Sequence, residues 1–204
     1  MKEFEAGTFT IGKPKENIFG KIFKILFIVF LCFFSSVYMF YIFFFNVNVY
    51  GSSMYPTFSD KNDEIALALR FYNLYHGDTV VILLDDTLLL KRVIALGDDE
   101  LSLILDKNTQ LCSYYINGQK LDEPYIKSSA EMNRTYFNKV EKLDNIQKEE
   151  TTALIILTLS IPHDEVFVLG DNRGVSKDSS SLGPMKRNNV QGKVILKYKG
   201  WKTG

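Results

Sequence analysis

Residues of the kinds that build metal sites and disulfide frameworks are scarce in this sequence. Its 204 residues include two cysteines and two histidines. Cys32 lies within the most apolar stretch of the chain, so we expect Cys32 and Cys112 to be free thiols rather than a disulfide framework. His76 and His163 supply too few ligands in suitable places for a zinc site of paired Cys and His residues. The sequence therefore predicts neither a bound metal nor a cofactor.

An excess of charge of either sign is also missing. The 24 Lys and Arg residues balance 24 Asp and Glu residues, which gives a formal net charge of +0. Without a basic surplus to hold phosphates, the chain is not expected to bind nucleic acid. At 204 residues with 46% hydrophobic residues, it is long enough for one core and a modest appendage.

Residues 25–45, which carry no charge, predict one transmembrane helix. It is dominated by Phe, Ile, Leu, Val and Tyr, and at 1.5 Å per helical residue it spans a hydrocarbon layer of roughly 30 Å. A cleavable signal peptide is the alternative, but its apolar region would cover about 7–15 residues and precede a small-residue cleavage site. A later apolar run, residues 153–161, is too short for a span and predicts a buried strand.

Basic residues flank the predicted span on one side only. Residues 46–60 contain no Lys or Arg, whereas lysines precede the span at Lys2, Lys13, Lys15, Lys21 and Lys24. Because positively charged flanks stay in the cytoplasm, residues 1–24 are predicted to be cytoplasmic. The predicted localisation is thus the cell membrane, with a single pass and an extracytoplasmic domain from residue 46 onward.

Short apolar runs alternate with turn residues beyond the span. Such runs indicate an antiparallel β domain. They occupy residues 64–69, 79–84, 88–96, 101–105, 114–116, 153–159, 166–169 and 192–198. Residues 127–152 are polar and lack period-2 alternation, so we interpret them as a mobile insertion outside the core.

Ser53 lies in the first of three segments that could perform chemistry. Small residues before it and the rigid Pro56 after it can hold a hydroxyl at a fixed backbone geometry, with amides nearby for an oxyanion. The alternative is a plain linker, which is the more common meaning of a Gly-Ser-Ser stretch after a membrane helix.

Lys91 occupies the middle of a predicted strand, residues 87–96, among aliphatic neighbours. Desolvation disfavours an ammonium group, so a lysine in this setting can be neutral and accept a proton from a serine hydroxyl. The alternative is an edge-strand lysine that blocks aggregation. The third segment, residues 168–183, places small, polar and charged residues directly after an apolar strand, which indicates either a structured loop or a solvated one.

Taken together and in this order, the segments resemble the conserved boxes of type I signal peptidases, particularly the single-span form of Gram-positive bacteria. The resemblance covers nearly the whole chain and becomes specific because several boxes occur in order. The matching residues are 51–57 (GSSMYPT), 76–81 (HGDTVV), 91–94 (KRVI), 115–118 (YING), 122–125 (DEPY) and 170–178 (GDNRGVSKD).

The resemblance implies a serine-lysine peptidase mechanism. Ser53 would attack the scissile carbonyl, and unprotonated Lys91 would be its general base. Ser176 would hydrogen-bond and orient the Lys91 amine, while Asp171 and Asp178 would hold the surrounding loop. The substrates implied are preproteins that bear signal peptides, in proximity to the secretion translocon.

Further roles are predicted for the neighbours of the two catalytic candidates. Arg92 is interpreted as a structural ion-pair partner. Met54 and Leu89, which flank the candidates in the sequence, are expected to line a shallow substrate pocket. Met54, Tyr55 and Phe58 are also expected to contact the lipid bilayer near the span.

The fold implied is mostly β. One N-terminal transmembrane helix would be followed by an antiparallel β catalytic core of residues 46–97 and 162–204. A smaller, inserted β-containing cap would comprise residues 98–161.

Two departures from the family pattern leave a second interpretation open. Ser180 stands where an arginine is usual, which removes the expected partner of Asp178, and residues 95–99 lack the usual Gly-Leu-Pro-Gly-Asp turn. The alternative is a non-catalytic assembly factor or chaperone for surface proteins. A Ser-His-Asp hydrolase is disfavoured, since Ser53 lacks the Gly-x-Ser-x-Gly elbow.

Overall fold

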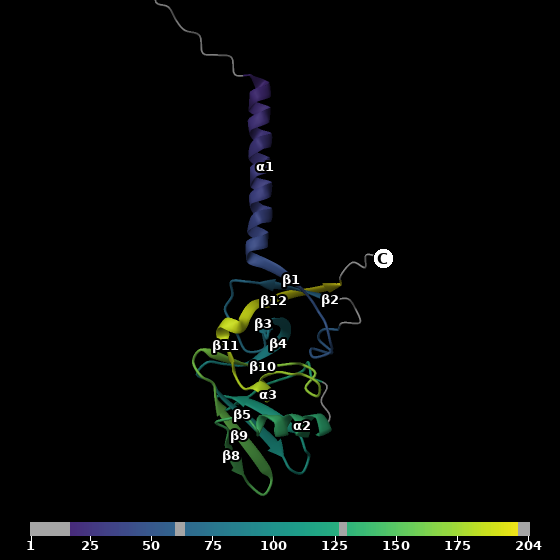
Figure 1. Cartoon of the computed structure of the whole chain (residues 1–204), viewed down its shortest axis with the longest axis vertical. Coiled ribbons are helices and arrows are strands. Elements are labelled where there is room, and N and C mark those ends of the chain that lie inside the picture. The colour runs from purple at the N-terminus through teal and green to yellow at the C-terminus, as the bar shows by residue number, and fades with distance from the viewer. Residues whose placement is uncertain (1–16, 60–63, 127–129, 200–204) are drawn as a thin grey trace, which may run out of the picture. The chain divides into compact units, whose positions relative to one another are not determined.

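The computed structural model describes residues 17–59, 64–126 and 130–199 of the chain, and it divides into two units at residues 42 and 43. The first unit contains helix α1 (Ile18–Phe43) except for its last residue. The second unit contains the two β-sheets (Figure 1). Each unit is described by itself.

Helix α1 is 26 residues long and has no buried residue. By length and composition it can cross a membrane. The helix begins at Ile18, before the predicted start of the span at residue 25. Lys21 and Lys24 are not expected within the hydrocarbon layer, but lysine is compatible with a helix. The helix ends at Phe43, before the predicted end of the span at Phe45, because the chain from Phe44 onward pairs with the strand of residues 64–69. The lysines that precede residue 17 lie outside the described residues.

All strand pairs in the second unit are antiparallel. The first sheet has seven strands in the order β1-β2-β12-β3-β4-β10-β11. These are β1 (Phe44–Asn48), β2 (Glu64–Leu69), β12 (Val190–Lys199), β3 (Thr79–Leu84), β4 (Thr87–Leu96), β10 (Glu165–Leu169) and β11 (Met185–Lys186). The mostly-β fold class predicted from the sequence is confirmed.

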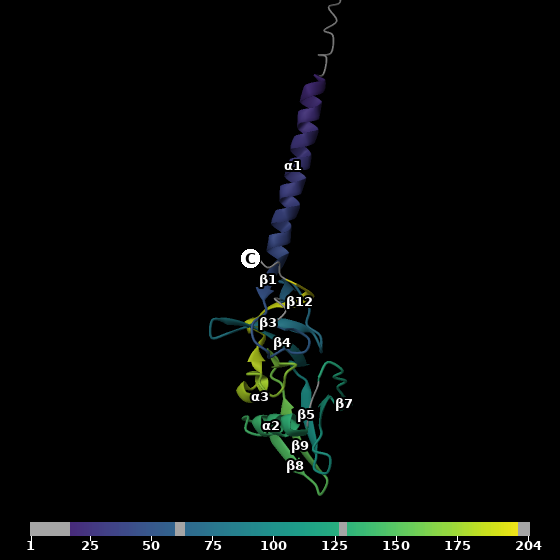
Figure 2. The ribbon, with the colours of Figure 1, turned by 90° about the vertical axis from the view of Figure 1, so that its right-hand side faces the viewer.

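The second sheet has five strands in the order β7-β6-β5-β9-β8. Helix α2 lies beside this sheet in both views (Figures 1 and 2). The strands are β7 (Gln119–Lys120), β6 (Cys112–Ile116), β5 (Glu100–Asp106), β9 (Leu154–Ser160) and β8 (Gln147–Glu150), and the helical segments of the unit are α2 (Ala130–Val140), α3 (Ser179–Leu182) and the 3-10 helix η2 (Arg187–Asn189).

The second sheet is inserted between two neighbouring strands of the first. Strand β4 runs into β5 through a short turn, β9 returns the chain to β10, and β4 pairs with β10. Ile94 of β4 and Phe167 of β10 belong to the same apolar cluster as Leu103 and Leu157 of the second sheet. The two sheets therefore share part of their core.

Helix α2 corrects one prediction about the polar segment 127–152. Tyr136, Phe137 and Val140 are at most 3% exposed and belong to the core cluster of the second sheet, so this part of the segment is not outside the core. The sequence hides this because only one face of the helix is apolar and polar residues dominate the rest. Residues 127–129 lie outside the described residues.

Truncation of Phe137 tests the packing of α2. Because its ring is 1% exposed, Phe137→Ala should lower the free energy of unfolding by about 3–5 kcal/mol. Chemical denaturation of the full chain in detergent, followed by tyrosine and tryptophan fluorescence, measures this change. Asn138→Ala on the exposed face of the same helix is the control and should change stability by less than about 0.5 kcal/mol. Equal effects of the two variants would contradict the assigned packing.

Candidate active site

Ser53 lies on a compact turn between β1 and β2. The turn is closed by backbone hydrogen bonds from Tyr55 N to Ser52 O at 3.1 Å and from Phe58 N to Met54 O at 2.9 Å. The side chains of Met54 and Phe58 are 2% and 4% exposed and belong to a core cluster of the first sheet. These two anchors fix the turn and leave the Ser53 side chain half-buried at its surface.

This burial corrects the expected lipid contacts. Met54 and Phe58 fill the core cluster with Ala66, Ala68 and other residues and are not available to a bilayer. Only Tyr55 of the three predicted residues has an exposed side chain, at 52%. The sequence could not separate the two cases, because an apolar residue beside a membrane span can either cover the core or face lipid.

The loop after β10 is hydrogen-bonded to the backbone of the Ser53 turn. Asn172 donates its backbone N–H to Ser53 O at 2.9 Å and its side-chain amide to Ser52 O at 3.0 Å. Gly170 approaches the same turn so closely that a Cβ on it would stand 2.5 Å from Ser53 O and 2.3 Å from Ser176 Oγ. Any larger residue at position 170 would displace one of the two serines.

Lys91 is buried in β4, between β3 and β10 in the interior of the first sheet. Its side chain is 2% exposed, and residues 90–95 are buried without interruption. Burial lowers the pKa of Lys91 from its ordinary value, and the negative charges of Asp178 and Asp171 oppose this shift in part. The alternative of an exposed edge-strand lysine is thereby excluded.

The Lys91 amine and the Ser53 hydroxyl are in hydrogen-bond contact. The distance from Lys91 Nζ to Ser53 Oγ is 3.1 Å, and a second bond joins Nζ to Leu90 O at 3.1 Å. The two residues are 38 positions apart in the sequence. A hydroxyl and a desolvated amine at this distance can exchange a proton.

Ser176 is buried beside this pair but does not bond Lys91 in the structure. Its side chain is 2% exposed, and its hydroxyl has no hydrogen-bond partner within the part of the chain that the structure describes. The predicted bond from Ser176 to the amine is therefore not among the contacts observed. The close approach of Gly170 to Ser176 Oγ nevertheless places this hydroxyl next to the Ser53 turn.

Arg92 and Asp171 form a buried, two-bond ion pair. Arg92 donates from Nε to Asp171 Oδ1 at 2.8 Å and from Nη2 to Asp171 Oδ2 at 2.6 Å. The Asp171 side chain is 1% exposed and also accepts a hydrogen bond from the Thr57 hydroxyl. Arg92 bonds Gly77 O at 2.8 Å as well. The pair thus connects β4, the 170–178 loop and the Ser53 turn.

Asp178 caps α3 and has no cation as a partner among the described residues. Its side chain accepts from Ser180 N at 3.0 Å, from the Ser180 hydroxyl at 2.7 Å and from Gly170 N at 2.9 Å. The Tyr136 hydroxyl lies 3.5 Å from the same carboxylate. The expectation that Ser180 leaves Asp178 without a partner is therefore wrong, because Ser180 itself donates twice.

A pocket of about 140 Å³ opens beside the Ser53 hydroxyl, between the end of β1 and the start of β4. The predicted substrate residues Met54 and Leu89 both line it. Sequence reasoning missed Val47, Val49 and Leu88, which contribute further apolar lining. Sequence reasoning missed these three residues because they lie beside turns and belong to no recognisable motif.

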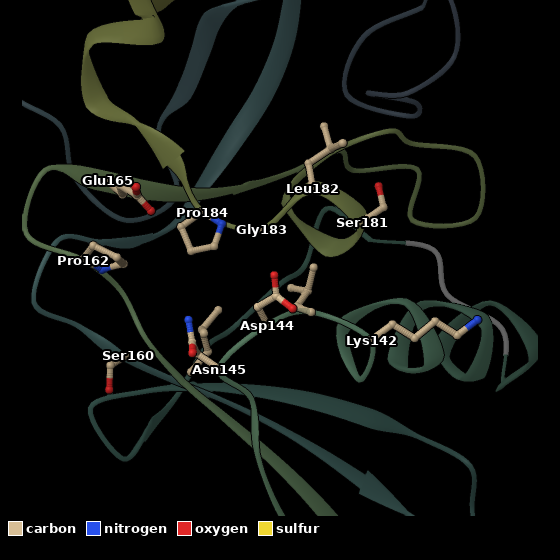
Figure 3. A pocket seen from close by; sticks show the side chains of 12 residues that line it. Lys142, Asp144, Asn145, Ser160, Pro162, Glu165, Ser181, Leu182, Gly183 and Pro184 are labelled. Carbon is tan, nitrogen blue, oxygen red and sulfur yellow. The ribbon is translucent and has the colours of Figure 1, made fainter.

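Another pocket, of about 460 Å³, lies away from Ser53. Figure 3 shows it between the chain after α2, the start of β10 and the chain after α3, with Asp144, Glu165 and Pro184 on its walls. It contains none of the residues predicted to be catalytic. The two histidines bond aspartates instead of Ser53: His76 contacts Asp99 at 2.7 Å and His163 contacts Asp98 at 2.6 Å.

Comparisons with known proteins identify the family of this chain. The family model described as signal peptidase, peptidase S26, matches residues 20–201. The chain belongs to this family. It is 33% identical to signal peptidase I S of Bacillus subtilis (strain 168) over 145 residues, which are 70% of each chain. It is 32% identical to signal peptidase IB of Staphylococcus aureus (strain N315) over 158 residues, 72% of this chain and 74% of the relative.

Two further members of the signal peptidase family are similar. Signal peptidase I V of Bacillus subtilis (strain 168) is 29% identical over 154 residues, which are 74% of this chain and 83% of the relative. A crystal structure of a signal peptidase I from Enterococcus faecalis V583 matches with 23% identity and a TM-score of 0.40, over 61% of this chain and 99% of that one.

Removal of Arg92 tests the ion pair that joins the three segments of the site. Arg92→Met should lower the free energy of unfolding by about 3–5 kcal/mol, because Asp171 then stays buried without its cation. Lys186→Met is the control: Lys186 bridges Asp164 and Glu165 with a side chain that is 58% exposed, so the cost should stay below about 1 kcal/mol. Denaturant titration in detergent measures both, and equal losses would argue against a special role of the buried pair.

Proposed function

We propose that this member of the signal peptidase family is a membrane-bound serine endopeptidase that removes signal peptides from exported preproteins. Ser53 is the nucleophile and Lys91 is the general base. The observation that supports this assignment most strongly is the 3.1 Å contact between the half-buried Ser53 hydroxyl and the amine of Lys91, which is 2% exposed. Neither histidine offers Ser53 a base.

In the proposed reaction, neutral Lys91 accepts the Ser53 hydroxyl proton while Oγ attacks the scissile carbonyl carbon. The negative charge that develops on the carbonyl oxygen is stabilised by the Ser53 backbone N–H. Lys91 then gives the proton to the leaving amine as the peptide bond breaks. Lys91 then deprotonates a water that attacks the acyl-enzyme, and it returns the proton to Ser53 Oγ as the ester bond breaks, which releases the signal peptide with a new carboxylate and restores the serine hydroxyl.

The pocket beside Ser53 favours a small side chain before the cut. Its volume is about 140 Å³, and its lining of Val47, Val49, Met54 and Leu89 is apolar. A pocket of this size and chemistry suits a small, uncharged residue of an extended substrate. The substrate segment would lie between the end of β1 and the start of β4.

The supporting residues are assigned by their contacts. Asp171 and Arg92 would hold the 170–178 loop against the Ser53 turn, and Asp178 would cap α3 at the end of that loop. Ser176, whose buried hydroxyl has no hydrogen-bond partner among the described residues, would orient the Lys91 amine. No metal or cofactor is part of the proposed reaction.

The proposed topology assigns residues 25–43, the part of α1 that follows Lys24, to a single membrane span and residues 1–24 to the cytoplasm. Residues 44–97 and 162–204 would then be an extracytoplasmic catalytic core, since β1 begins at Phe44, with residues 98–161 as its cap. The helix from Ile18 to Phe43 has the length and composition that such a span needs. With this topology the protein would lie in the lipid bilayer, in the vicinity of the secretion translocon.

Replacement of Ser53 and Lys91 tests the assignment directly. Ser53→Ala and Lys91→Met should each reduce cleavage of a purified preprotein in detergent by about three orders of magnitude or more. Mass spectrometry locates the cut, which should follow a small residue at the end of the signal peptide. Ser52→Ala and Lys148→Met are matched controls and should cleave normally. A wild type as inactive as both variants on several preproteins would favour a non-catalytic assembly factor or chaperone.

The pH dependence of cleavage tests the base. Because Lys91 acts in its neutral form, activity should be low where Lys91 is protonated and should rise with pH through its pKa, which burial holds below the 10.5 of an ordinary lysine. Rates measured across this range with a short soluble peptide should give one alkaline limb. His76→Gln and His163→Gln should leave that limb in place, and a limb that moved with either histidine would contradict the assignment.

A further inference from the structure

Glu123 and Tyr125, in the segment after β7, each contact one of the two buried arginines beside the candidate active site. The Glu123 carboxylate accepts a hydrogen bond from Arg173 Nη2. The centroid of the Tyr125 ring lies 3.9 Å from the guanidinium carbon of Arg92. The Tyr125 hydroxyl donates to Glu123 Oε1 at 3.2 Å, so the two contacts are joined.

Arg173 connects Glu123 to the 170–178 loop. Its side chain is 4% exposed, lies over the ring of Tyr114 at 4.9 Å and donates from Nε to Gly170 O at 3.1 Å. Gly170 in turn donates its N–H to Asp178 and touches the backbone of Ser53. Among the described residues, Glu123 is the carboxylate that forms an ion pair with Arg173. Without Glu123 the guanidinium would be buried and unpaired, which is costly.

Arg92 connects Tyr125 to the Ser53 turn. The ring of Tyr125 covers one face of the guanidinium, whose edge makes the two bonds to Asp171. Asp171 accepts from Thr57, four residues after Ser53, and its neighbour Asn172 donates to Ser53 O. A planar guanidinium stacked on an aromatic ring has less freedom to turn, so its two bonds to a carboxylate keep their direction.

We propose that Glu123 and Tyr125 are positioning residues, which set the geometry of Ser53 against Lys91 through Arg173 and Arg92. They touch neither the reacting atoms nor the pocket beside Ser53. Their action is to fix the two arginines, and through them both ends of the segment from Gly170 to Arg173. This inference rests on the proposed chemistry of Ser53 and Lys91.

A positioning role differs from simple filling of space in what it requires of Tyr125. Packing alone needs an apolar side chain of similar volume, which leucine supplies in large part. Positioning needs an aromatic face over the guanidinium, which phenylalanine retains and leucine lacks. The pair Tyr125→Leu and Tyr125→Phe therefore separates the two roles.

The experiment measures kcat and KM of the full chain in detergent on a short soluble signal-peptide substrate, well below the melting temperature of every variant. Tyr125→Leu should lower kcat by about tenfold, with KM unchanged within about twofold, because the pocket is intact. Tyr125→Phe should retain most of the activity. Tyr115→Leu is the matched control and should behave as wild type, because Tyr115 is a partly buried residue of β6 whose ring contacts no arginine among the described residues.

Glu123→Gln provides a second variant that keeps the volume of the side chain and removes its charge. It should lower kcat without changing KM, and this variant decides the matter if Tyr125→Leu does not fold. A normal kcat for folded Tyr125→Leu would overturn the proposal, and so would equal losses of kcat in Tyr125→Leu and Tyr125→Phe. If Tyr125→Leu does not fold, a normal kcat for Glu123→Gln would overturn it. Ser53→Ala is measured in parallel: if it cleaves as wild type does, the proposed chemistry fails, whereas an inactive Ser53→Ala beside a normal Tyr125→Leu rejects the positioning role alone.

Discussion

The burial of one lysine amine is the constraint on which the rest of the site depends. An ammonium group inside a sheet would be unfavourable, and burial lowers the pKa of Lys91 for that reason. The amine has two hydrogen-bond partners, the Ser53 hydroxyl and Leu90 O. Whatever keeps water from Lys91 therefore also keeps it available as the proposed base, and the position of β4 between β3 and β10 serves the proposed chemistry as well as folding.

Neighbouring charges are arranged so that they do not cancel this effect. Asp171 and Asp178 both favour the protonated form of Lys91. The negative charge of Asp171 is balanced by the two bonds from Arg92, and Asp178 is surrounded by neutral donors from Ser180, Gly170 and Tyr136. A carboxylate stabilised by hydrogen bonds to neutral groups can remain buried without a cation of its own.

The sequence predicted most of the strands from local signals, whereas the proposed Ser53 and Lys91 pair was implied by the resemblance of several segments, in order, to the boxes of the signal peptidase family. Strands β2 and β3 were predicted with their observed bounds, since each is a short apolar run bounded by turn residues. Tyr136 of α2 gave no such signal, because its burial depends on a sheet formed by other parts of the chain. Contacts such as Tyr125 on Arg92 are equally invisible in one sequence, because a tyrosine after a proline shows nothing of the partner across the fold.

The connection between distant segments determines when the site can form during synthesis. Ser53 and Lys91 are both present once the first half of the chain has been made. The hydrogen bond from Asn172 to Ser52 joins positions 120 residues apart, and that from Thr57 to Asp171 joins positions 114 residues apart. Such long-range contacts form late, because the chain must close a large loop first. A growing chain therefore contains the serine and the lysine before it contains the loop that holds them, and the proposed peptidase activity must wait until the final quarter of the chain has emerged.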